Sequence, residues 1–220
     1  MALGTATVLY EPRFDAGRIC LDLLATTHPV ERLDSLPPLR AWITGSGLVP
    51  PGTPLAHADT SWLAGFRELR VCVGQLVRGS LGGEHRSYDL GPGRDPRSYD
   101  LGPGRDPRSY DRALSRVNDL ARAAAPPALR AVRGEDGGLV RELAGPPECA
   151  ALLAALARDA VELLTDPVAR ASLRQCEGDN CPIVYLDMSR GRRRRWCSSE
   201  VCGNRERVAR HRRRAALARA

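Results

Sequence analysis

Four of the seven cysteines in the chain lie in two closely spaced pairs near its C-terminal end. Four residues separate Cys176 from Cys181, four separate Cys197 from Cys202, and fifteen separate the two pairs. A structural zinc ion takes four ligands at the corners of a tetrahedron, and two short turns that each return two sulfurs to one point supply such a set. The spacing therefore predicts one structural zinc ion bound by these four cysteines.

Other uses of the paired cysteines stay open at this point, namely two disulfides, a redox thiol pair or an iron–sulfur cluster. The first residues of the chain are neither basic nor strongly apolar, and no run of 18 apolar residues occurs, so we expect a cytoplasmic protein without a membrane span. A reducing compartment favours metal over disulfides. Cys20, Cys72 and Cys149 lie in apolar stretches and are expected to be core residues.

The residues around the cysteine pairs indicate a small treble-clef-like finger, made of a knuckle, a β-hairpin and a helix. The turn-forming residues 178–180 permit a tight knuckle. Residues 183–185 are predicted to form a strand, and residues 192–196 are predicted to form the second strand, paired with it. Either Ser198 or Ser199 can cap the helix that follows.

Positive charge is concentrated in the same part of the chain. Residues 190–220 contain twelve arginines and two glutamates, a formal charge of +10, whereas the whole chain carries +7. The chain has no lysine, which indicates a GC-rich coding bias, but such a bias does not explain why the arginines cluster at one end. We expect a polyanionic partner, bound by the following residues. They are Arg192, Arg193, Arg194, Arg195, Arg205, Arg207, Arg210, Arg212, Arg213 and Arg214.

Residues 200–218 are expected to form one helix. Val201, Val208 and Ala215 recur every seven residues and predict a packed face, with the arginines on the other sides. Such a helix fits the major groove of B-DNA, where guanidinium groups bind phosphates and guanine. The alternatives are a solvated cationic face, a by-product of coding bias, or an acidic protein partner.

The remainder of the chain is predicted to be a helical domain, residues 1–173, followed by the finger at residues 174–220. A tandem repeat of eleven residues fills 86–107 and is expected to be a loop insertion, because each unit contains Gly-Pro-Gly and Asp-Pro. The apolar periodicity and the turn GEDGG predict the other elements. These are helices at 14–28, 36–48, 59–78, 110–124, 147–165 and 166–173, and a hairpin of 129–133 with 139–143.

Two stretches resemble a known family. The run DMSRGRRRRWCSSEVCGNRERVARHRRR, with Cys202-Gly203-Asn204-Arg205 inside it, resembles the CGNR zinc finger. The segments GRICLDLLATTH and LPPLRAWITGSGLV resemble the ABATE domain, which is helical and precedes that finger. The resemblance implies that the four paired cysteines bind zinc and that the chain is a stress-induced transcription regulator.

These observations predict a nucleoid-associated, bacterial-type regulator that binds double-stranded DNA. Its N-terminal domain is expected to sense a signal, such as a small-molecule effector, or to form a homodimer. The competing hypothesis is an RNA-binding protein or a protein–protein adaptor that uses the same basic module. We expect no enzyme, because no activated nucleophile, paired carboxylates or phosphate-binding glycine motif is recognisable and four cysteines close the metal site.

Overall fold

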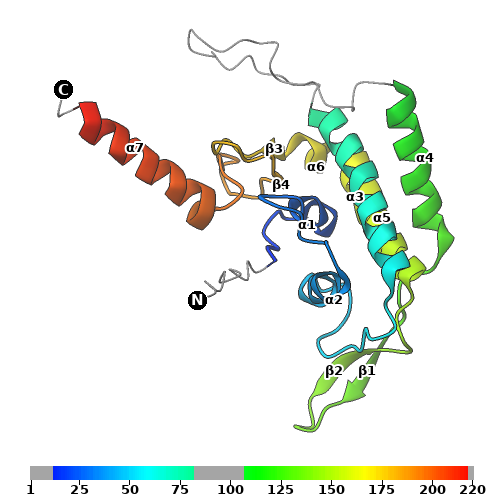
Figure 1. Cartoon of the computed structure of the whole chain (residues 1–220). Helices are drawn as coiled ribbons and strands as arrows, with labels where there is room; N and C mark the ends of the chain where they lie inside the picture. Colours follow the sequence, from blue (N-terminus) through cyan, green and yellow to red (C-terminus); the bar gives the residue numbers. More distant parts are fainter. Residues whose placement is uncertain (1–11, 82–106, 218–220) are drawn as a thin grey trace, which may run out of the picture.

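The computed structural model of the chain describes residues 12–81 and 107–217 (Figure 1). The elements of this described part are the helices α1 (Ile19–Ala25), α2 (Leu36–Gly45), α3 (Thr60–Leu81), α4 (Pro107–Ala123), α5 (Cys149–Thr165), α6 (Pro167–Ala171) and α7 (Asn204–Leu217), a π-helical turn η3 (Ser199–Gly203), and the strands β1 (Leu129–Arg133), β2 (Leu139–Leu143), β3 (Leu173–Gln175) and β4 (Val184–Leu186). The predicted class is confirmed: a mainly helical chain with two small antiparallel hairpins and a four-cysteine cluster near its C-terminal end. The predicted repeat loop lies outside the described residues, except for Pro107.

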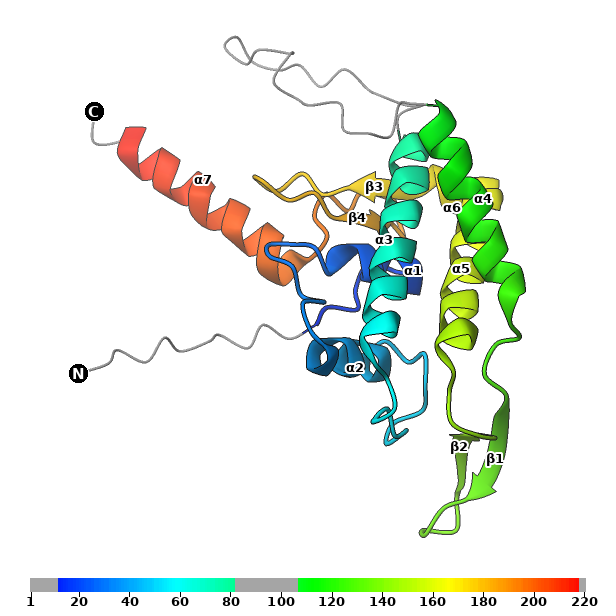
Figure 2. The ribbon, with the colours of Figure 1, turned by 45° about the vertical axis from the view of Figure 1, so that its right-hand side comes forward.

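Three helices, α3, α4 and α5, lie side by side and form the body of the molecule (Figures 1 and 2). The predicted apolar face of α3 is buried, since Phe66, Leu69 and Val73 are completely shielded from solvent. Asp59 caps the start of this helix, because its Oδ1 accepts the amide of Ser61 at 2.9 Å. The core therefore follows the periodicity of the sequence.

The short helices α1 and α2 both contact α3, and α1 also contacts α5. The ring of Trp42 on α2 packs between Phe14 and Phe66, with centroid distances of 6.3 and 6.0 Å. Both helices are shorter than predicted: α1 covers only Ile19–Ala25, and α2 ends at Gly45.

The hairpin β1–β2 forms at the predicted bounds and extends away from the helices (Figure 2). Its register pairs Val132 with Val140 across the two strands. Leu139 is 77% exposed, so the hairpin adds little to the core. None of the helices in 12–81 and 107–217 combines the length and the apolar character that crossing a bilayer needs.

The hairpin of the finger differs from the prediction in its second strand. Strand β4 pairs in antiparallel fashion with β3, which precedes the first cysteine, and Leu173 lies opposite Leu186. Residues 192–196, predicted to be the partner strand, return beside β4 without forming a strand. Two side chains hold this irregular return: the Tyr185 hydroxyl donates to the carbonyl of Arg194 at 2.5 Å, and Asp187 Oδ2 accepts the Arg194 amide at 3.0 Å.

Helix α7 projects from the finger away from the three-helix body (Figure 1). Its main contact is with the π-helical turn that precedes it. The packed face predicted through Val201, Val208 and Ala215 is confirmed at Val201, which packs against the core, and is wrong at Val208, which is 42% exposed. Helix α7 presents nearly its whole circumference to solvent over its described side chains.

Candidate metal centre and basic helix

The first cysteine pair lies on a tight turn between β3 and β4. The amide of Cys176 donates to the carbonyl of Ile183 at 2.9 Å, and the amide of Cys181 donates to that of Gly178 at 3.1 Å. A Cβ at Gly178 would lie 3.2 Å from Cβ of Cys202 and 3.5 Å from Sγ of Cys176. A glycine at this position therefore allows the second pair to approach the first.

The second pair brackets the start of the C-terminal helix. Ser198 caps it, since its hydroxyl accepts the amides of Glu200 and Val201 at 3.2 Å each. The turn η3, which contains Cys202, then continues directly into α7. The direction of α7 is consequently set by the cysteines themselves.

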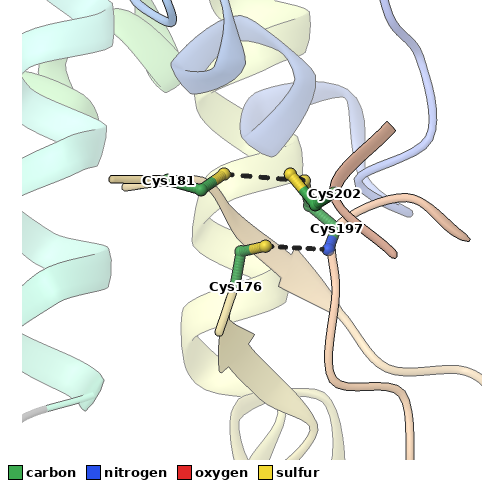
Figure 3. A group of neighbouring side chains, drawn as sticks. All are labelled: Cys176, Cys181, Cys197 and Cys202. Atoms are coloured by element: carbon green, nitrogen blue, oxygen red, sulfur yellow. Dashed lines mark hydrogen bonds between the residues drawn. The ribbon is translucent and has the colours of Figure 1, made fainter. Parts of the chain in front are cut away.

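Figure 3 shows the four sulfurs converging on one point. All four lie within 4.8 Å of one another and all four residues are buried. The sulfur of Cys197 is 3.7 Å from that of Cys181 and 3.6 Å from that of Cys202. A tetrahedron with Zn–S bonds of about 2.3 Å has edges of about 3.8 Å, whereas a disulfide would need about 2.05 Å. Cys176, Cys181, Cys197 and Cys202 thus fit one structural zinc ion, and they form no disulfide in this structure.

The four thiols perturb one another because they lie so close together. Hydrogen bonding by the side chains of Cys181 and Cys197 lowers the pKa of the Cys176 thiol. Hydrogen bonding with the Cys176 side chain in turn raises the pKa values of Cys181 and Cys197. Deprotonation of one thiol therefore makes deprotonation of its neighbours less favourable. A bound divalent ion would allow all four sulfurs to be deprotonated together.

Two of the arginines in the run 192–195 have structural contacts. Arg194 stacks on the ring of Tyr185 at 4.5 Å and donates to the carbonyls of Trp196 and Cys197. Arg195 forms an ion pair with Glu177 at 2.5 Å. Arg192 and Arg193 are exposed. The assignment of all four arginines of this run as nucleic-acid contacts remains a prediction.

Helix α7 carries half of the twelve arginines of residues 190–220. Its 14 residues contain six arginines and one glutamate, and every one of the six is exposed. Three of them, at steps of three and four residues, share one face of the helix. These are Arg207, Arg210 and Arg214; the others are Arg205, Arg212 and Arg213.

Sequence reasoning missed the part that the N-terminal segment plays in the finger. The amide of Leu186 on β4 donates to the carbonyl of Ala16 at 2.8 Å, and Arg194 donates to the carbonyl of Asp15 at 3.2 Å. Arg13 reaches Cys197 from the same segment. No local signal could have revealed these contacts, because Arg13 and Cys197 are 184 residues apart in the sequence.

The three remaining cysteines lie outside the cluster. Cys20 and Cys72 are buried, as predicted, and Cys149 is partly buried. Desolvation by burial raises the pKa of each of these thiols. They therefore remain protonated thiols of the helical core, without the character of metal ligands or nucleophiles.

Family models match both the helical domain and the finger. A model named ABATE, with the description "Putative stress-induced transcription regulator", matches residues 17–167. The model of the CGNR zinc finger matches residues 172–215 and so spans all four cysteines of the cluster. Neither family is an enzyme family. No curated protein matches the chain.

Proposed function

The chain belongs to the ABATE family and ends in a CGNR zinc finger, and we propose that it is a transcription regulator whose zinc finger presents helix α7 to double-stranded DNA. The observation that carries this proposal is the combination of a buried four-cysteine cluster with a helix that starts from it and exposes all six of its arginines. The metal fixes the base of the helix, and the helix supplies the charge.

The dimensions of α7 suit a DNA groove. With 14 residues the helix is about 21 Å long, and its diameter matches the width of the major groove of about 12 Å. The face of Arg207, Arg210 and Arg214 would lie against the groove and bind its phosphates, and Arg205, Arg212 and Arg213 would extend the positive charge around the other sides of the helix. Arg192 and Arg193 are exposed in the same finger and would add to its positive charge.

The positive charge of α7 and of the residues before it is offset by few acidic side chains in the same stretch of sequence. Residues 190–217 contain Glu200 and Glu206 as their only acidic side chains, and Glu206 already accepts the amide of Asp179 at 3.2 Å. The unopposed guanidinium groups favour a polyphosphate over a neutral partner. The module has one tryptophan, Trp196, and no aromatic residue beyond it, so stacking on single-stranded bases contributes less than duplex binding.

We assign residues 174–220 to DNA binding and the helical domain, residues 1–173, to signal sensing or dimerisation. The exposed strands β1 and β2 offer apolar side chains to a second copy. A regulator of this kind would act in the cytoplasm, on the nucleoid.

The proposal is tested by titrating labelled duplex DNA with the zinc-loaded chain over a series of salt concentrations. We expect binding whose affinity falls steeply with salt, with duplex DNA preferred over structured RNA in competition. A preference for RNA would assign the basic module to the competing RNA-binding function. Negligible binding to every nucleic acid, with zinc retained, would leave a protein–protein adaptor and would overturn the proposal.

A further inference from the structure

We propose that Arg13, in the segment before α1, is an outer-sphere partner of the zinc-bound thiolates, so that the helical domain helps to hold the metal of the finger. The four ligands all come from residues 176–202, whereas Arg13 belongs to the opposite end of the chain. The inference rests on zinc binding by the cysteines and is independent of DNA binding.

The guanidinium of Arg13 lies against Cys197. Its Nη1 and Nη2 are 3.9 and 3.8 Å from the Cys197 sulfur, and Nη2 also donates to the carbonyl of Cys197 at 3.3 Å. Asp15 holds the same Nη2 at 2.6 Å, and the Arg13 side chain is only 20% exposed. The group is therefore fixed beside the sulfur and largely removed from solvent.

The segment that carries Arg13 is anchored on both sides. Asp22 Oδ1 of α1 accepts the amide of Ala16 at 2.9 Å, while the carbonyl of Ala16 accepts from Leu186 of the finger. Arg18 then binds Asp159 of α5 at 2.8 Å. The helical domain thus determines where Arg13 stands relative to the cluster.

The chemistry of the cluster gives this guanidinium a role. Zinc with four thiolates carries a net charge near −2, and donors to the sulfurs offset it. The amides of Gly178 and Cys197 donate to the Cys176 sulfur at 3.4 and 3.3 Å. Arg13 does the same for the Cys197 sulfur, and its donor is a charged guanidinium that is also paired with Asp15. Partners of metal ligands typically change metal affinity by roughly 10- to 100-fold.

The test compares Arg13→Gln with Arg40→Gln in the full chain. Arg40 is a matched control because its guanidinium donates to the carbonyls of Ala56 and Ala58, inside the helical domain. Competition with a chromogenic chelator measures zinc affinity, and we expect it to fall by roughly tenfold or more for Arg13→Gln and to stay unchanged for Arg40→Gln. Arg13→Lys, which keeps the charge, should recover part of the loss.

Cobalt substitution separates an effect on sulfur from an effect on folding. Removing a positive charge beside a thiolate raises the energy of its lone pairs, so the sulfur-to-cobalt charge-transfer band of Arg13→Gln should move to longer wavelength. Equal zinc affinities for Arg13→Gln and the wild type would overturn the proposal. A loss of affinity with an unmoved band would also overturn it, because Arg13 would then act only through the main chain of Cys197. If Arg13→Gln does not fold, the affinity and band of Arg13→Lys decide in the same way.

Discussion

Removal of two arginines from one face of α7 should weaken duplex binding by a calculable amount. Arg207 and Arg210 are exposed and share that face. Each phosphate contact contributes about 0.9 to the slope of log affinity against log salt, so the loss of two should reduce the slope by about 1.8. At 0.1 M salt this corresponds to roughly a 60-fold loss of affinity, or about 2.5 kcal/mol.

The assay is fluorescence anisotropy of a labelled mixed-sequence duplex, titrated with the Arg207→Ala/Arg210→Ala variant at several salt concentrations. Alanine is the best helix former, so α7 should stay helical, and the cysteine cluster is untouched. The control is Arg133→Ala/Arg141→Ala, which removes the same charge from exposed positions of the hairpin β1–β2. That hairpin lies at the other end of the molecule from α7 (Figure 1).

The two variants distinguish direct contact from general electrostatics. We expect the wild-type slope for the hairpin variant and the reduced slope for the α7 variant. If the α7 variant keeps the wild-type slope, α7 is not part of the interface. If both variants lose affinity equally, the effect of the arginines is one of net charge, and the proposed docking of α7 is refuted.

Three further perturbations test the metal centre and the helical domain. Cys197→Ser should release zinc and expose the finger to limited proteolysis, whereas Cys149→Ser should keep the metal; equal metal content in the two variants would argue against the ligand assignment. Gly178→Ala should lower zinc affinity in chelator competition, because the new Cβ would lie 3.2 Å from Cβ of Cys202, and an unchanged affinity would mean that the turn has room for it. Burial raises the pKa of Asp22 from 3.8 to about 7, so the folded protein holds a proton that the unfolded chain releases, and the free energy of unfolding should fall as pH rises from about 4 to 7. Asp22→Asn should remove that part of the pH dependence, and urea unfolding curves that change with pH identically in the two proteins would contradict this assignment.

Elements set by local signals were predictable from the sequence. The hairpin β1–β2 forms at its predicted bounds because apolar residues flank the turn residues of 134–138. The cysteine cluster could be predicted equally well, since each cysteine pair lies on a short turn that is closed by its own main-chain hydrogen bonds. The cap at Ser198 follows from the preference of serine for that position.

Features that depend on long-range packing could not be predicted in this way. The strand partner of β4 is Leu173–Gln175, although residues 192–196 also follow a turn and return beside β4. There they are bonded to the side chains of Tyr185 and Asp187 and form no strand. The seven-residue recurrence through Val208 is the same whether a helix packs or projects. The contact of Arg13 with the cluster arises from the docking of the two parts of the chain.

Zinc binding by the four cysteines is tested most directly by metal analysis of the natively purified chain, combined with X-ray absorption at the zinc edge. We expect one zinc ion per chain with four sulfur neighbours at about 2.3 Å. A chain without bound metal whose four clustered thiols are alkylated in the native state, or a zinc ion with fewer than four sulfurs, would contradict it.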